Sequence, residues 1–158
     1  RLVRDWSSDV CSSDLRRIRD AAEVEEKRFY EERMPEAWEE VLTPLGTDYV
    51  KDHITDAPWI VVLFRQSQRM RGEDDMSPTY YSQESCGIAA GLFIAAVHNM
   101  GLTTLTHTPS PMGFLRDILD RPFHEHAMLL MPVGYPAEDA EVPDLERKDL
   151  DEVSEFFE

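Results

Sequence analysis

A run of apolar and small residues at positions 87–97 constrains the fold of this chain more than any other feature of the sequence. The surrounding segment, 82–99, contains no proline and is followed by Gly101, which predicts a helix that ends before that glycine. Because the run is apolar around nearly its whole circumference, the helix is expected to be buried. Gly87 and Gly91 lie one helical turn apart and would let another backbone approach closely. We therefore expect a neighbouring helix against this face, from this chain or from a second subunit.

Two short apolar runs, 59–64 and 127–133, predict buried strands because they are too short for helices. Segment 103–106 is a third candidate strand. Two short helices are expected at 48–53 and 111–119, and a polar, mobile loop is expected at 65–79. Helices thus alternate with strands along the chain, which is typical of an α/β or α+β sandwich around one sheet.

Segment 16–42 is rich in Glu, Ala, Arg and Met and is predicted to be helical, with a break or kink at Pro35. Its apolar face is weak, because an acidic residue interrupts the row formed by Ile18, Ala22 and Phe29. We therefore expect a partly exposed helix or lid rather than a core helix.

The first fifteen residues look foreign to the rest of the chain. Ser-Ser-Asp occurs twice, at 7–9 and 12–14, and the segment has neither a helical nor a strand period. It also lacks the apolar stretch of a secretory signal and begins without Met. Our hypothesis is that residues 1–15 are not native and that the true N-terminal part of the protein is missing, so Cys11 is given no role.

Charge and cysteine content exclude several classes of function. The chain carries 32 acidic and 16 basic residues, and its net charge of -16 repels phosphate backbones and anionic membrane surfaces. No apolar run approaches the roughly 20 residues of a membrane span. Half of the net charge lies in segment 137–158, where Arg147 and Lys148 are the basic residues. Two cysteines cannot build a disulfide framework, so we expect a reducing, cytoplasmic location.

Common catalytic motifs are missing from the sequence. It contains no dinucleotide-binding glycine fingerprint, no phosphate-binding P-loop and no nucleophile elbow. His124 and His126 have no further ligand close in sequence, so no metal site is expected. Cys86 begins a helix of small residues, where a thiol usually serves packing.

An ordered series of short motifs nevertheless resembles the nitroreductase-like flavoproteins, and within them the iodotyrosine deiodinase branch. The series covers about residues 17–150, and its spacing rather than any one motif carries the resemblance. The motifs are Asp56-Ala57-Pro58, Tyr80-Tyr81, Glu84-Ser85, Gly87-Ile88-Ala89, Asn99-Met100-Gly101-Leu102, Thr106-His107-Thr108-Pro109, Arg121-Pro122, His124-Glu125, Pro132-Val133-Gly134-Tyr135-Pro136, Val142-Pro143-Asp144-Leu145 and Arg147-Lys148.

The resemblance implies an α+β sandwich in which helices flank a central, mostly antiparallel sheet. It also implies an obligate homodimer with FMN at the interface between subunits. The implied activity is the reductive removal of halogen from a halogenated tyrosine or a related halophenol. A nicotinamide cofactor or a reductase partner would supply the electrons.

The same resemblance assigns roles to individual residues. Glu26, Tyr30 and Lys51 match the trio that binds the ammonium and carboxylate of an amino-acid substrate, and Glu26 and Tyr30 share one helix face because they lie four residues apart. A hydroxyl at Thr108 would lie near N5 of the flavin and favour one-electron steps. The cofactor-binding residues implied by the family are Thr106, His107, Thr108 and Arg147.

On this interpretation residues 16–158 form a partial nitroreductase-like domain, with a substrate lid at 16–55, a core at 56–136 and an acidic extension at 137–158. The family's N-terminal phosphate-binding cluster would precede residue 16, so the chain is expected to hold about half of an FMN site. Two alternatives stay open. One is a nitroreductase acting on nitroaromatics or quinones, and the other is a protein that binds flavin or an aromatic amino acid without turnover.

Overall fold

The computed structural model describes residues 12–70 and 76–157. The hypothesis about residues 1–15, with Cys11, therefore falls largely outside the described residues, and the first helix begins at Ser12. The helices are α1 (Ser12–Arg28), π-helical η1 (Phe29–Arg33), α2 (Glu36–Leu42), 3-10 helical η2 (Thr43–Leu45), α3 (His53–Asp56), α4 (Ser82–Asn99), α5 (Gly113–Ile118) and α6 (Leu150–Val153). The strands are β1 (Trp59–Gln66), β2 (Gln68–Met70), β3 (Met76–Pro78), β4 (Thr103–Thr104) and β5 (Glu125–Gly134).

The main sheet has the order β1-β5-β4, and both of its strand pairs are antiparallel. The α+β class and the antiparallel sheet expected from the sequence are thus confirmed. Strand β5 is central, and its residues 130–133 are buried. The mobile loop expected at 65–79 is wrong for part of that segment, because β2 and β3 pair antiparallel within it. Residues 71–75 of the expected loop lie outside the described residues.

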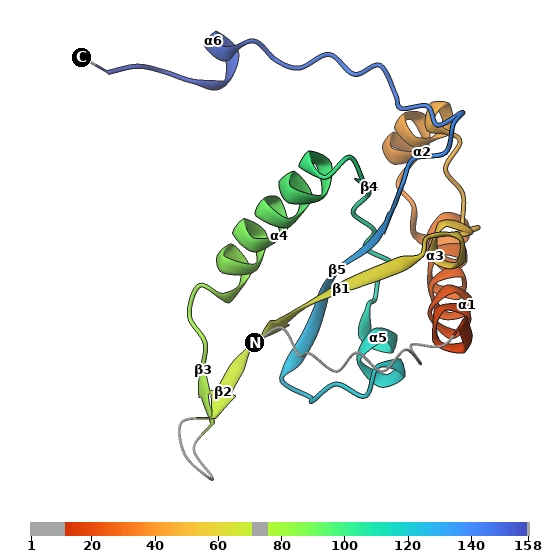
Figure 1. The fold of residues 1–158 in the computed structure, drawn as a ribbon, viewed down its shortest axis with the longest axis vertical. Coiled ribbons are helices and arrows are strands. Elements are labelled where there is room, and N and C mark those ends of the chain that lie inside the picture. The colour runs from red at the N-terminus through yellow and green to blue at the C-terminus, as the bar shows by residue number, and fades with distance from the viewer. Residues whose placement is uncertain (1–11, 71–75, 158) are drawn as a thin grey trace.

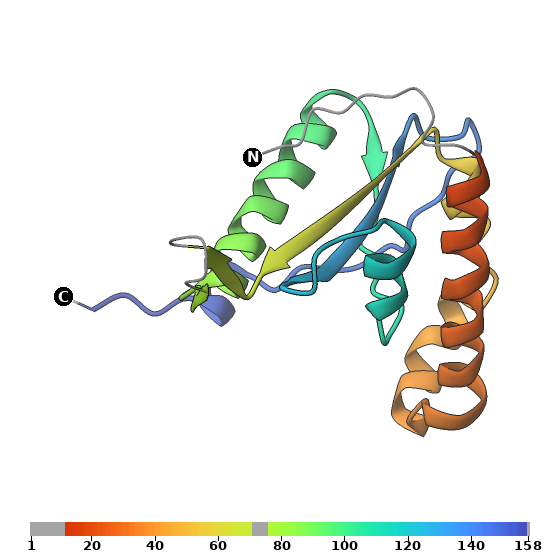
Figure 2. The same cartoon turned by 90° about the horizontal axis from the view of Figure 1, so that it is seen from below.

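Helices cover the sheet from both sides (Figure 2). Helix α4 contacts β1 and β4 on one side of the sheet, while α1 and α5 lie on the opposite side. The chain reaches α4 through the hairpin β2–β3 and leaves it at Gly101, whose φ of 73° suits a residue without a side chain. Segment 135–153 is exposed throughout and extends away from the body of the fold (Figure 1).

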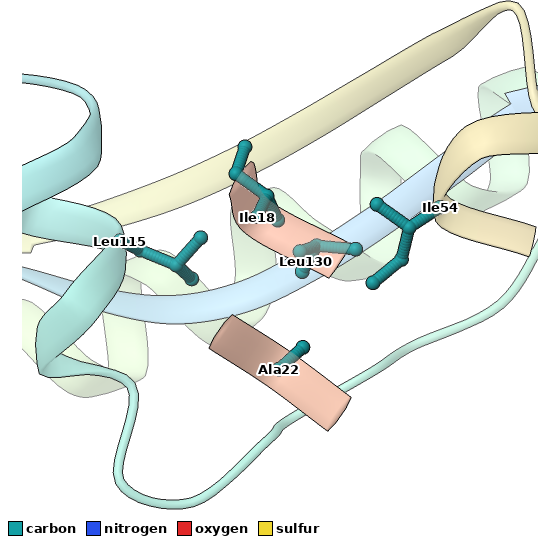
Figure 3. Packing of buried hydrophobic residues seen from close by; sticks show 5 residues of the cluster. All are labelled: Ile18, Ala22, Ile54, Leu115 and Leu130. Carbon is teal, nitrogen blue, oxygen red and sulfur yellow. The ribbon is translucent and has the colours of Figure 1, made fainter. Parts of the chain in front are cut away.

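The core lies between the sheet and the α1–α5 side (Figure 3). Ile18 and Ala22 of α1 are buried there against Leu115 of α5 and Leu130 of β5. The expectation of a partly exposed helix or lid rather than a core helix is therefore wrong for Ile18 and Ala22, while the other described side chains of α1 are half-buried or exposed as expected. Two apolar side chains on one face are enough to bury this part of the helix, because α3, α5 and β5 supply the other apolar side chains of the cluster.

Helix α4 departs from the sequence-based expectation in the opposite direction. Of its residues only Ala90 and Val97 are buried, while Ile88 and Leu92 are 67% and 69% exposed. The prediction of a buried helix is thus wrong within one chain. One face of α4 packs on the sheet, and the rest of its apolar circumference has no cover from the described residues.

The smaller predictions differ mainly at element boundaries. The helix expected at 48–53 lies instead at His53–Asp56, because Lys51 and Asp52 accept the first hydrogen bonds of that turn. The helix expected at 111–119 is α5 at Gly113–Ile118. Among residues 12–70 and 76–157, no helix combines the length and the apolar character that crossing a membrane requires.

Candidate functional site

A cavity of about 790 Å³ opens where the α1–η1–α2 segment meets the stretch before α3 and the stretch after β4. Three chain segments line it, and six of the seven residues predicted for the site lie in them. These six are Glu26, Tyr30, Lys51, Thr106, His107 and Thr108. The structure thus brings together residues that lie more than 80 positions apart in the sequence.

Glu26 and Tyr30 enter the cavity from one side of the first helix. The helix changes from α to π geometry at Phe29, between these two residues. A π turn is rare and is frequently found at functional sites. The aromatic rings around this turn also pack together. Phe29 contacts Tyr30 and Trp38 edge to face, at centroid distances of 5.7 and 5.8 Å.

Lys51 is buried and is held by contacts on its backbone and on its side chain. Its backbone N–H donates to Glu23 Oε1 at 2.9 Å, which ties the segment before α3 to α1. Its ammonium donates to the backbone carbonyl of Asp48 and lies 5.6 Å from the centroid of the Tyr30 ring. This separation allows a cation–π attraction, so Lys51 and Tyr30 form one side of the cavity.

Glu23 supports this arrangement from α1. Burial disfavours its charged form, but the Lys51 N–H bond and the Arg19 guanidinium outweigh burial and hold the pKa of Glu23 below its ordinary value. Arg19 lies 2.7 Å from Glu23 and also pairs with Asp52 beyond Lys51. Lys51 is therefore positioned by an ionic network and not by its own short loop alone.

The two oxygens of the Glu26 carboxylate have different partners. Oε1 lies 3.2 Å from Nε2 of His107, and Oε2 lies 3.5 Å from Nζ of Lys51. Burial opposes ionisation of Glu26, but the His107 hydrogen bond and the charges of Lys51 and His107 outweigh it, so its pKa lies below its ordinary value. Glu26 is an ionised carboxylate between two nitrogen donors.

The segment after β4 presents its side chains alternately. Thr106 and Thr108 are exposed, and His107 between them is buried, as expected for an extended backbone. His107 makes two 2.9 Å backbone hydrogen bonds with Leu130 of β5, which fix this segment to the central strand. The His107 ring contacts the Glu26 carboxylate. Its predicted contact with the cofactor stays a prediction.

His53, the first residue of α3, also lines the cavity and was missed by the sequence reasoning. Its Nε2 lies 3.3 Å from Nδ1 of His107, with the rings edge to face. Burial, followed by the charges of His107 and Lys51, lowers the pKa of His53 to about 4. The only local signal in the sequence was its position two residues after Lys51.

Arg147, the remaining predicted site residue, does not line the cavity. It lies in the exposed C-terminal extension, and within the described parts of the chain it has no hydrogen bond or ion pair. Its predicted cofactor contact therefore stays a prediction. Across the same described residues, no group of three or more His, Cys, Asp or Glu side chains could hold a metal ion.

Comparison with known proteins identifies the family. A sequence profile described as the nitroreductase family matches residues 9–135, which is most of the chain. The chain belongs to the nitroreductase family. The resemblance found in the sequence is thus confirmed, and the match starts within the segment that we took as foreign.

Two similar proteins within the nitroreductase family carry the same name. An iodotyrosine deiodinase of Haliscomenobacter hydrossis is 52% identical over 133 residues, which cover 84% of this chain and 60% of that protein. An iodotyrosine deiodinase of Danio rerio is 40% identical over 151 residues, which cover 94% of this chain and 51% of that protein. The chain therefore spans little more than half the length of these relatives.

A solved structure supports the fold. The crystal structure of oxidized iodotyrosine deiodinase bound to FMN and 3-iodo-L-tyrosine matches with a TM-score of 0.75 at 24% identity. The match covers 88% of this chain and 68% of that one. At this identity it establishes that the two chains share a nitroreductase-family fold.

Proposed function

We propose that this chain forms part of an FMN-dependent reductive dehalogenase that acts on halogenated tyrosine or related halophenols. The observation that carries the proposal is the meeting of Glu26, Tyr30 and Lys51 in one cavity, with Lys51 Nζ 3.5 Å from Glu26. The names of its relatives point the same way. The proposal includes a cytoplasmic location, which rests on the low cysteine content. It also includes no nucleic-acid partner, because a net charge of -16 repels phosphate backbones.

The trio matches the charges of an amino-acid zwitterion. The ionised Glu26 carboxylate can accept hydrogen bonds from the substrate ammonium, while the Lys51 ammonium and the Tyr30 hydroxyl can donate to the substrate carboxylate. Both ionic side chains are nearly buried, with 13% and 10% of their surface exposed. Ion pairs with a bound substrate would therefore be only weakly screened by water and salt.

The cavity suits the ring system of FMN better than its phosphate. The exposed hydroxyls of Thr106 and Thr108 border the cavity and make no hydrogen bond to another cavity-lining residue, so both can bond to polar atoms of the ring. The cations Arg33 and Lys51 in the cavity lining are paired with Glu25 and Glu26. The FMN phosphate therefore needs a cation from outside this lining, and Arg147 remains our proposal for it.

The chemistry divides between the cofactor and the chain. When bound, FMN supplies the two electrons that, with a proton, replace a carbon–halogen bond by a carbon–hydrogen bond and release halide; a nicotinamide cofactor or a reductase partner replenishes them. The chain holds the substrate at its amino-acid end. Apolar side chains of the lining would cover part of a bound aromatic ring, namely Phe29, Trp38, Leu42 and Leu105.

A homodimer is also part of the proposal, because α4 needs a partner. Ile88 and Leu92 lie exposed on α4, and a Cβ added at Gly87 or Gly91 would meet no atom within 4 Å. An exposed apolar helix with two small residues suits close packing against the same helix of a second copy. Sedimentation should show a dimer that Leu92→Glu converts to monomer, and a monomeric wild type would contradict this part of the proposal.

The first test of function is FMN binding, followed by turnover. Quenching of FMN fluorescence should be measured on this chain and on a version extended at its N-terminus towards the length of its relatives. The form that binds FMN is then supplied with 3-iodo-L-tyrosine and dithionite, and iodide release is measured. Absence of FMN binding by both forms would refute the proposal. Binding without iodide release would favour the non-catalytic alternative, and preferential reduction of a nitroaromatic would favour the nitroreductase.

The substrate trio has its own test. Glu26→Gln removes the charge that faces the substrate ammonium, so the Kd for 3-iodo-L-tyrosine should rise about 10- to 100-fold, as expected for a lost charge-assisted contact. Glu32→Gln is the matched control, because Glu32 is an exposed carboxylate six residues further along the same segment. Equal affinities of the two variants would remove Glu26 from the site.

A further inference from the structure

One residue of the site has a contact that the substrate trio does not explain. His107 Nε2 faces Glu26 Oε1 at 3.2 Å, while Lys51 faces the other oxygen, Oε2. All three side chains are at least 87% buried. An ionised carboxylate in such a place needs a partner at each oxygen, because a buried and unpaired charge is costly.

The donor on this contact is settled by chemistry. A carboxylate held in its ionised form only accepts hydrogen bonds, so Nε2 of His107 carries the hydrogen. The other ring nitrogen, Nδ1, faces Nε2 of His53 at 3.3 Å, and one hydrogen lies between these two atoms. The contact of Nδ1 with His53 thereby helps to orient the Nε2–H group of His107 towards Glu26.

The position of His107 is fixed independently of α1. Its backbone makes two hydrogen bonds with Leu130, which is fully buried in the central strand. Its ring packs against His53 of α3 at a centroid distance of 5.0 Å. Glu26 belongs to α1, so the His107 contact links the carboxylate of this helix to the sheet.

Substrate binding changes the partners of Glu26 unequally. Lys51 pairs with Glu26 in this structure, so a zwitterion has to enter between them, with its ammonium at Oε2 and its carboxylate at Lys51. Each charge then keeps an opposite partner. During this exchange Lys51 leaves Glu26, whereas the contact between Oε1 and His107 can persist because it lies on the other oxygen.

We propose that His107 is a positioning residue that holds the Glu26 carboxylate in place for the ammonium of an α-amino-acid substrate, and so makes the site selective for amino acids over simple phenols. This inference rests on the proposed function. His53 supports the His107 ring from the side opposite to Glu26.

The test compares two substrates that differ only in the amino-acid group. At saturating FMN, His107→Leu should raise the KM for 3-iodo-L-tyrosine about tenfold more than the KM for 2-iodophenol, as expected when a hydrogen bond to a charge is lost. The second substrate has no ammonium for Glu26 to bind, so it registers any effect of the substitution on FMN or on the fold. His107→Gln, which keeps an N–H within reach of Glu26, should restore the KM to within about threefold of wild type.

Other outcomes separate the possible failures. An equal rise in KM for both substrates, or no rise for either, would overturn the positioning role, since a purely structural effect does not distinguish them. If His107→Leu fails to fold, His107→Thr and His107→Gln are compared with wild type under the same criteria. Absence of iodide release by the wild type would refute the proposed function itself.

A spectroscopic readout checks the contact without turnover. In protein labelled with ¹⁵N-histidine, the Nε2 resonance of His107 should be that of a protonated nitrogen at neutral pH and should move in Glu26→Gln. Binding of 3-iodo-L-tyrosine should shift it, and binding of 2-iodophenol should not. A His107 resonance that ignores Glu26→Gln would overturn the inference even if the enzyme is active.

Discussion

Acidification should weaken this fold through His53. Burial, together with the charges of His107 and Lys51, lowers the pKa of His53 to about 4, against 6.5 for an unperturbed histidine. As the pH falls below 6.5, the unfolded chain takes up a proton on this ring before the folded chain does. Stability that is fully present above pH 6.5 is therefore lost progressively as the pH falls towards 4.

The size of the effect follows from the two pKa values. Linkage of one fully buried group with these values would give a loss of about 2 kcal/mol at pH 5 relative to pH 7.5. His53 is only half-buried and is partly screened by solvent, so we expect a loss of about 1 kcal/mol. A loss of that size is a substantial part of the stability of an ordinary domain. The same protonation would place a positive charge beside His107 and Lys51.

The assay is urea unfolding at pH 7.5 and pH 5.0, at one protein concentration so that association does not differ. Carboxylates also titrate in this range, so the quantity of interest is the pH-dependent loss in wild type minus the loss in His53→Gln. We expect this difference to be about 1 kcal/mol. His98→Gln, which removes an exposed ring on α4, is the matched control and should lose stability in parallel with wild type. Equal losses in wild type and His53→Gln would refute the reasoning.

Three further predictions concern packing and binding. Leu115→Ala, at a fully buried core position, should lower the free energy of unfolding by about 2–5 kcal/mol in urea denaturation; a loss below about 1 kcal/mol would contradict its burial. Gly134→Ala would place a Cβ 2.9 Å from Cδ of Pro58 and should cost about 1–3 kcal/mol, while Gly113→Ala meets no atom and serves as its control. Lys51→Gln should weaken binding of 3-iodo-L-tyrosine about 10- to 100-fold by titration, and an unchanged Kd would remove Lys51 from the site.

The sheet could be predicted from the sequence because its two main strands, β1 and β5, correspond to apolar runs that have clear ends and are too short for helices. Pro58 precedes β1, and the turn after Gly134 closes β5, so each strand was located to within two residues of its observed bounds. Helix α4 was placed correctly because Gly101 marks its end. These signals are local, and local signals survive tertiary packing.

Burial was harder to predict, because it depends on what lies opposite. The apolar circumference of α4 was taken to be covered, but the described residues cover only the side that includes Ala90 and Val97. Conversely, Ile18 and Ala22 gave a weak helical face, yet they reach the core because Leu115 and Leu130 meet them there. Hydrophobic periodicity reports which face can be buried and not which face finds a partner.

The site could be predicted in part, where local spacing or the family resemblance indicated its residues. The spacing of Glu26 and Tyr30 places both on one helix face, and the family resemblance supplied Lys51 and the stretch around Thr108. The link from Glu26 to His107 and on to His53 is formed only by folding, and no spacing in the sequence indicates it.

The charged cluster at the cavity also bears on how this chain folds. Glu26 and His107 are separated by 81 positions, and His107 and His53 by 54. Closing the chain over such separations costs loop entropy before these contacts can form. The cluster is therefore complete only once α1, α3 and β5 have docked together. A ligand that binds there selects the fully folded chain, so it should slow hydrogen exchange in all three elements at once, in proportion to its concentration over its Kd.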